Sequence, residues 1–252
     1  MIELKTKEEI EKLRYSNKIV AEILQIIKEN TKPGMTGVDL DGIARIECEK
    51  RGVKPAFLGL YGFPAALCVS INEEIVHGIP KKEKVIKEGD IVSIDFGVVV
   101  DGWYGDAAIS YGVGKISDRK QRLLEGVERS LMAGIEKCVP GNNLKDVSGA
   151  IEDVLKEYRL APICDYGGHG IGRKPHEDPH VPNCRSMADN LTLKEGMVLA
   201  IEPMATLGKK PNYYRKLKDD WTVVSKDKSL AAHFEHSVAI TENGPEILSK
   251  LD

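Results

Sequence analysis

The sequence predicts an α+β fold in which a pair of helices followed by antiparallel strands occurs twice. Two pairs of helical patterns are each interrupted by a Pro-Gly dipeptide, and strand-like segments follow each pair instead of alternating with single helices. Residues 33–57, laid onto residues 140–164, share identical residues at turn and helix-packing positions. We therefore expect a single domain, 1–252, with two similar halves of about 1–110 and 111–252.

The first helix pair is marked by its start and stop signals. Thr6 and Glu9 fit a capping box, and apolar residues then recur at helical spacing until Pro33. A second helical pattern runs from near Thr36 to about Arg51.

The second helix pair repeats this plan. Helical patterns are expected over residues 117–138 and 143–158, on either side of Pro140-Gly141. Residues shared between the pairs are Pro33 with Pro140, Gly34 with Gly141, Asp39 with Asp146, Gly42 with Gly149 and Pro55 with Pro162.

Strands are expected where β-branched residues alternate with polar ones between Gly, Asp, Asn and Lys turns. These segments are residues 67–71, 90–113, 197–207, 221–225 and 231–241.

Composition limits the class of protein. The chain has 252 residues, 42% apolar and 30% charged, which excludes a largely disordered chain. Acidic residues outnumber basic ones by 39 to 36, so the net charge of −3 gives no general attraction to nucleic-acid phosphates. No apolar run approaches the roughly 20 residues that cross a bilayer, and the start is charged, unlike a signal peptide. We expect a cytoplasmic protein that binds neither membranes nor DNA.

The cysteines predict no special chemistry. Their number is odd, and no Cys-x-x-Cys pair occurs, so the pattern is neither a disulfide framework nor a thiolate zinc site. We expect buried free thiols without a role at Cys48, Cys68, Cys138, Cys164 and Cys184.

Two aspartates interrupt one predicted hairpin. Asp95 and Asp106 lie in otherwise apolar strands on either side of Asp101-Gly102, the preferred sequence of a two-residue type I′ turn. This turn pairs Val100 with Trp103 and makes the two aspartates diagonal neighbours on one face. Two carboxylates so close repel each other unless a cation or a shared proton lies between them. The hairpin alone favours the simpler interpretation, two surface aspartates on a solvated sheet face.

Two glutamates and a histidine extend this pattern. Glu202 and Glu235 interrupt later apolar strands, and His169 lies among glycines that let the backbone approach a ligand closely. The four carboxylates balance two divalent cations, and one added imidazole suits a two-metal hydrolytic site. Each of these residues taken singly could be structural.

A second motif competes with this interpretation. Residues 176–180 match the His-Glu-x-x-His pattern of single-zinc proteases, which works only on a helix. Pro179 falls inside the required helical turn, with Pro175 and Pro182 on either side, so a helix is disfavoured.

The motifs together resemble the type I methionine aminopeptidases over nearly the whole chain. The segments that carry the resemblance are residues 70–80, 89–108, 167–183, 193–204 and 219–248. The resemblance implies the pita-bread fold, with two pseudo-symmetric halves, antiparallel sheet and helices outside. It implies a hydrolase that removes the N-terminal methionine of nascent proteins and peptides when the second residue is small. Its cofactor would be two divalent ions, of Co, Mn, Fe(II) or Zn.

The resemblance also implies roles for particular residues. Asp95 is similar to a ligand of one metal, and His169 and Glu202 to ligands of the other. Asp106 and Glu235 are similar to the residues that bridge both. His77 is similar to a histidine that contacts the substrate near the scissile amide, His176 to one that hydrogen-bonds its carbonyl, and Glu202 to the proton carrier. The candidates for the methionine pocket are Phe57, Leu60, Phe63 and Trp221.

Some features leave specificity and partners open. Pro175 stands where relatives carry a larger apolar residue, and Phe57 and Leu60 also depart from some relatives. We expect a monomer that meets nascent chains. A basic loop contains Lys209, Lys210, Arg215, Lys216 and Lys218. This loop is either a solvated surface or a contact with ribosomal RNA. The alternatives are another dinuclear-metal peptidase of this fold, such as a proline-cleaving enzyme, or a non-catalytic binding protein on the same scaffold.

Overall fold

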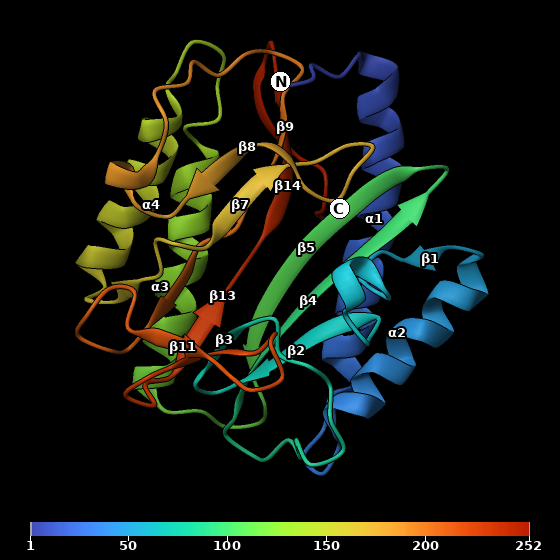
Figure 1. The fold of residues 1–252 in the computed structure, drawn as a ribbon, viewed down its shortest axis with the longest axis vertical. Coiled ribbons are helices and arrows are strands. Elements are labelled where there is room, and N and C mark those ends of the chain that lie inside the picture. Colours follow the sequence, from blue (N-terminus) through green and yellow to red (C-terminus); the bar gives the residue numbers. More distant parts are fainter. Residues whose placement is uncertain (1, 252) are drawn as a thin grey trace.

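Two helix pairs flank a set of antiparallel sheets in the computed structural model, which describes residues 2–251 (Figure 1). The helices are α1 (Lys7–Asn30), α2 (Gly37–Arg51), α3 (Asp118–Ile135) and α4 (Leu144–Glu157). All four lie where the sequence predicts them. Among the described residues, no helix combines the length and the apolar character needed to cross a bilayer.

The helix boundaries follow from local signals. The capping box at Thr6 is present, with the Glu9 N–H donating to Thr6 Oγ1 at 3.3 Å and the Thr6 N–H donating to Glu9 Oε2 at 2.9 Å. Helix α3 ends at Ile135, before the predicted Cys138, because hydrogen bonds to carbonyls three residues back tighten the chain there. Gly34 and Gly141, which precede α2 and α4, have φ values of +93° and +92°. The equivalent Pro-Gly turns therefore share a left-handed backbone conformation.

The strands are short apart from one long hairpin. Strands β4 and β5 pair over their full length, and Val100 opposes Trp103 as the Asp101-Gly102 turn predicts. Short 3₁₀ turns lie at Leu60–Gly62 and Arg185–Met187. The strands are β1 (Lys54–Pro55), β2 (Leu67–Ile71), β3 (Glu74–Val76), β4 (Ile91–Val100), β5 (Trp103–Gly112), β6 (Ala161–Pro162), β7 (Gly167–Gly170), β8 (Glu177–Pro182), β9 (Val198–Ile201), β10 (Met204–Thr206), β11 (Tyr214–Lys216), β12 (Val223–Ser225), β13 (Ala231–His233), β14 (His236–Thr241) and β15 (Gly244–Ile247).

Two sheets contain Asp95, Asp106 and His169, three of the predicted metal ligands. One contains β1, β4 and β2, with β5 paired to β4, and the other has the order β15-β14-β9-β7-β8. The two meet where Ala108 of β5 bridges Glu235, with backbone hydrogen bonds of 2.9 and 3.3 Å. Residues from distant parts of the sequence therefore converge between the sheets.

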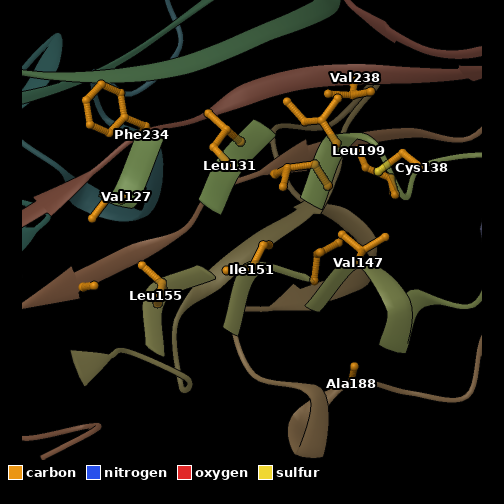
Figure 2. Packing of buried hydrophobic residues seen from close by; sticks show 14 of the residues in the cluster. Val127, Leu131, Cys138, Val147, Ile151, Leu155, Ala188, Leu199, Phe234 and Val238 are labelled. Atoms are coloured by element: carbon orange, nitrogen blue, oxygen red, sulfur yellow. The ribbon is translucent and has the colours of Figure 1, made fainter. Parts of the chain in front are cut away.

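Each helix pair packs against strands through its own buried apolar cluster. Figure 2 shows the cluster of the second pair, which includes Leu131 of α3, Ile151 of α4, Leu199 of β9 and Val238 of β14. A separate cluster joins α1 and α2 to β2, β4 and β5. Helix α1 also packs closely on β5, because a Cβ at Gly105 would lie 2.7 Å from the Ser16 backbone.

The prediction that all five cysteines are free is wrong. Cys164 and Cys184 form a disulfide, whereas Cys48, Cys68 and Cys138 are free and buried as expected. Cys164 precedes β7 and Cys184 follows β8. Because β7 and β8 pair in antiparallel fashion, these two residues lie close together, with a Cα–Cα distance of 5.2 Å. This disulfide could not be predicted from the sequence, because the two cysteines are brought together by the hairpin and do not form a cysteine motif.

Candidate metal centre

The β4–β5 hairpin places Asp95 and Asp106 side by side. Asp95 pairs with Ala108, and Asp106 pairs with Gly97, so the two carboxylates are diagonal neighbours on one face. They are only 7% and 4% exposed. The sequence-based register is confirmed, and the alternative of two solvated surface aspartates is excluded.

The backbone of Asp106 is held from two directions. Its N–H donates to Asn17 Oδ1 of α1 at 3.1 Å, and its carbonyl accepts a hydrogen bond from Ser237 Oγ of β14 at 2.8 Å. Glu235, 2% exposed, lies between β13 and β14 and pairs with Ala108 as described above. These contacts fix the two carboxylates relative to each other.

Strands β7 and β9 supply His169 and Glu202. His169 pairs with Ala200, and Glu202 directly follows β9. Glycine is required beside the histidine, because a Cβ at Gly168 would lie 1.9 Å from the Ala200 carbonyl oxygen. His169 Nδ1 lies 2.9 Å from the Gly170 carbonyl oxygen. Because a carbonyl only accepts, Nδ1 carries the proton and Nε2 has a free lone pair for a metal.

The donor atoms fall into two compact groups. Asp106, His169 and Glu235 form one, while Asp95 and Glu202 form the other together with His233. Within each group the possible ligand atoms lie within 4.8 Å of one another. The structure thus brings together all five residues that the sequence suggested as metal ligands.

His233 is a residue that the sequence did not single out. It is fully buried in β13, and neither ring nitrogen has a hydrogen-bond partner within normal geometry among the described residues. Burial, followed by the effect of His77, lowers its pKa to about 3, so the ring is neutral. The segment Ala231–His236 contains two histidines and gives no sign of which one faces the carboxylates.

Burial strongly raises the pKa values of the four carboxylates. Burial raises the pKa of Asp95 to about 7. Burial first, and then neighbouring carboxylates, raises the pKa values of Asp106, Glu202 and Glu235 well above their ordinary values. Four acidic groups that cannot all ionise together are an unfavourable arrangement without cations.

The chemistry of this cluster fits divalent cations. Asp95 Oδ1, Asp106 Oδ1 and Glu235 Oε1 are buried without a hydrogen-bond partner within residues 2–251. Such oxygens are ordinarily paired or bound to a metal. Oxygen donors with a neutral imidazole suit hard and borderline divalent ions.

Two further histidines flank the carboxylates. The His176 and His169 ring centroids are 4.5 Å apart, and the His77 ring lies edge to face with Tyr166 at 5.9 Å. Burial, followed by the effect of His176, lowers the pKa of His77 to about 4. Burial also lowers the pKa of His176. Both rings are therefore neutral near pH 7, and each can donate a hydrogen bond through an N–H.

The His-Glu-x-x-His motif is not helical. His176 precedes β8, and His180 lies within β8, where it pairs with His169. The spacing therefore does not place His176 and His180 on one helical face, and the single-zinc interpretation is excluded.

A cavity of about 750 Å³ contains these groups. It is lined by every residue that the sequence suggested for the site: Phe57, Leu60, Phe63, His77, Asp95, Asp106, His169, His176, Glu202, Trp221 and Glu235. Pro175 is not among the described lining residues. The lining residues that sequence analysis missed include Tyr61, Cys68, Val76, Tyr166 and Met204.

One wall of the cavity is apolar. Phe57, Phe63 and Cys68 are buried there, and the Phe63 and Trp221 rings meet edge to face at 5.1 Å. Cys68 could have been found from the strand register, because it pairs with Asp95 and so lies beside the carboxylates. The arrangement combines a pocket for an apolar side chain with a candidate metal centre.

Comparison with known proteins agrees with this geometry. Residues 11–242 match the model of metallopeptidase family M24. Methionine aminopeptidase from Aquifex aeolicus is 52% identical over 99% of both chains. The Escherichia coli methionine aminopeptidase is 42% identical over 98% of this chain and 94% of its own.

Solved structures show the same fold. Methionine aminopeptidase from Thermotoga maritima superposes with a TM-score of 0.96 at 45% identity, covering 100% of both chains. A prolidase from Pyrococcus horikoshii, 22% identical, shares the fold with a TM-score of 0.78, and the match covers 99% of this chain and 64% of the prolidase. The pita-bread fold predicted from the sequence is confirmed. The chain belongs to the methionine aminopeptidases of metallopeptidase family M24.

Proposed function

We propose that this protein is a metal-dependent aminopeptidase that removes the N-terminal methionine from nascent proteins and peptides. The observation that carries the proposal is the cluster of four carboxylates, three of them buried, and His169 in a cavity with an apolar wall. A free amino terminus and a methionine side chain match these two features. The kinship with methionine aminopeptidases over nearly the whole chain supports the same activity.

We propose that two divalent ions bind here. Asp95, Asp106, His169, Glu202 and Glu235 would hold them. Their four negative charges would balance two divalent cations. When bound, the ions would supply Lewis-acid chemistry, which polarises a peptide carbonyl and lowers the pKa of water. Mn, Fe(II), Co and Zn all suit this donor set.

The chain's own residues would provide the remaining chemistry. Glu202 is partly exposed to the cavity, which suits a group that accepts a proton and passes it to the leaving amine. His77 and His176 would donate hydrogen bonds to the first peptide unit, where negative charge develops. Their lowered pKa values keep them neutral, so they act as N–H donors rather than as cations.

We propose that the apolar wall selects methionine. Phe57, Leu60, Phe63 and Trp221 would surround its side chain, and Cys68 lies in the same cluster. A long unbranched side chain gains from burial on such a surface. By kinship, a small second residue would be preferred.

We also propose that residues 1–252 act as one catalytic domain. Asp95 and Asp106 come from residues 1–110, and the other proposed ligands from residues 111–252, so neither segment alone completes the centre. All five cations of the basic loop, Lys209, Lys210, Arg215, Lys216 and Lys218, are exposed on or beside β11. They would favour contact with ribosomal RNA. Charge reversal of this loop should lower co-sedimentation with ribosomes at low salt, and unchanged co-sedimentation would contradict the contact.

A peptide panel separates methionine removal from other peptidase activities. The metal-loaded protein should release methionine from Met-Gly and Met-Ala peptides, and release little from Leu-Gly or Met-Leu peptides. A proline-cleaving enzyme would instead require proline at the second position. Binding of these peptides without any cleavage would support a non-catalytic protein.

A further inference from the structure

Lys5 and Glu177 form a buried ion pair between the segment before α1 and the turn that carries His176. The Lys5 Nζ lies 2.8 Å from Glu177 Oε2 and 3.1 Å from Glu3 Oε2. The side chains of Lys5 and Glu177 are only 3% and 14% exposed. Because removal of one member of a buried pair leaves the other charge uncompensated, the pair holds the two segments firmly together.

The backbone of Lys5 is itself fixed. Its N–H donates to the carbonyl of Gly196 at 2.7 Å. Gly196 has a φ of +87°, and a Cβ there would lie 2.9 Å from the Lys5 carbonyl oxygen. Gly196 lies just before β9, which belongs to the same sheet as β7 and β8. The Lys5 side chain therefore starts from a fixed point on the sheet that carries His169.

Glu177 organises the turn between β7 and β8. Its Oε1 accepts a hydrogen bond from the Lys174 N–H at 3.2 Å, while its Oε2 accepts one from Lys5. The turn packs directly on this pair, because a Cβ at Gly172 would lie 2.6 Å from Lys5 Cε and 2.7 Å from Glu177 Oε1. His176 is the residue that precedes Glu177, so this contact fixes the backbone from which the His176 ring projects.

The His176 ring depends on that backbone for its placement. The residue is exposed, and its ring stacks on Tyr61 at 6.1 Å and meets His169 edge to face at 4.5 Å. Tyr61 is 74% exposed and so restrains the ring weakly. A shift of the turn would move the ring relative to the cavity.

We propose that Lys5 is a positioning residue, which acts through Glu177 to hold His176 at the cavity. The proposal rests on the function proposed above, in which His176 donates a hydrogen bond to the substrate carbonyl. Misplacing such a donor by about 1 Å can cost about 100-fold in rate. Because the hydrogen bond strengthens in the transition state, its loss lowers kcat more than it raises KM.

The test uses charge-removing variants of nearly unchanged size. Lys5→Met and Glu177→Gln each remove one charge of the pair. The matched control is Lys7→Met, which breaks an ion pair from the same segment, to Glu242, with a distance of 3.4 Å and side chains 84% and 62% exposed. Each change is made in the full chain, alone and together with His176→Ala. We measure kcat and KM for a Met-Gly-start peptide with the metal-loaded enzyme.

In the wild-type background, Lys5→Met and Glu177→Gln should each lower kcat about 10- to 100-fold, with a smaller change in KM. Lys7→Met should change kcat by less than about twofold. When His176→Ala is already present, adding Lys5→Met should lower kcat by a further factor of less than about two. The effect of Lys5 passes through the His176 side chain, which this background lacks.

If Lys5→Met lowers kcat by the same factor in the wild-type and His176→Ala backgrounds, the proposal is overturned. A general structural effect or a smaller folded fraction would lower kcat by the same factor whether or not His176 is present. An unchanged kcat in Lys5→Met would overturn it as well. If His176→Ala lowers kcat strongly while Lys5→Met acts independently, the role of His176 stands and only the positioning role of Lys5 falls. If His176→Ala leaves kcat unchanged, both roles fall.

Discussion

Asp95 and Asp106 lie diagonally across the β4–β5 hairpin, Asp95 opposite Ala108 and Asp106 opposite Gly97. Both carboxylates are buried on the face that meets Glu235. Their nearness raises the cost of ionising both and so makes a cation between them favourable. The proposed metal chemistry of the protein follows from this one register.

Replacement of Asp106 by Asn should abolish most of the activity without unfolding the protein. The change removes one negative charge that faces Asp95 and Glu235. We expect kcat/KM to fall by more than about 100-fold. Substitution of a residue that only hydrogen-bonds to a metal ligand already lowers metal affinity or activity by about 10- to 100-fold. Asp101→Asn, in the exposed turn of the same hairpin, is the control and should have near-normal activity. Near-normal turnover of the Asp106 variant would refute its proposed role.

The stability of the metal-free protein should fall as the pH rises. Burial raises the pKa of Asp95 to about 7 in the folded protein, above the value of about 4 in the unfolded chain. Between these values the unfolded chain has lost a proton that the folded protein keeps, so rising pH favours unfolding. Asp106, Glu202 and Glu235 shift in the same direction.

Added divalent metal should therefore raise the Tm more at pH 7.5 than at pH 5, because metal binding competes with protons for these carboxylates. Thermal unfolding with and without metal across this range measures the difference. The same increase in Tm at every pH would be inconsistent with metal binding at the perturbed carboxylates.

The Cys164–Cys184 disulfide should stabilise the β7–β8 hairpin that carries His169. Reduction, or Cys184→Ser, should cost about 3 kcal/mol in the free energy of unfolding, the value expected from a closed loop of this length. Denaturant unfolding with and without reductant measures this loss. In the Cys184→Ser variant the reductant should have no further effect. Equal stability of the oxidised and reduced wild-type protein would contradict the assignment.

Truncation of Trp221 should weaken methionine selection. The Trp221 ring packs against Phe63 in the apolar wall of the cavity, so Trp221→Ala enlarges the pocket. We expect kcat/KM for a Met-Gly peptide to fall at least about 10-fold, because lost apolar contacts in a pocket cost roughly this much. Tyr15→Ala, which removes an exposed aromatic ring from α1, is the control. An unchanged ratio of Met-Gly to Leu-Gly cleavage would exclude Trp221 from the pocket.

The elements that could be predicted from sequence carry local signals. Capping residues such as Thr6 and Thr36 mark helices, and Asp101-Gly102 sets a hairpin register, because these conformations depend on few neighbouring residues. The five proposed ligands could be suggested because charged residues inside apolar strands need partners.

Other features arise only in three dimensions. Strand β7 is Gly-Gly-His-Gly, which has little strand propensity, and it becomes a strand through its pairing with β8 and β9. His233 faces the carboxylates only because β13 lies beside β10 and close to them. The disulfide and the Lys5–Glu177 pair likewise join residues whose proximity depends on the complete fold.

The most direct test of the metal-centre account is metal removal and return. The protein is treated with a chelator, dialysed, and supplied with Mn²⁺ or Co²⁺ while calorimetry counts bound ions and release of methionine from a Met-Gly-start peptide is followed. We predict no release by the metal-free protein, recovery on addition of metal, and two ions per chain at saturation. Methionine release that persists after complete removal of metal would contradict the account.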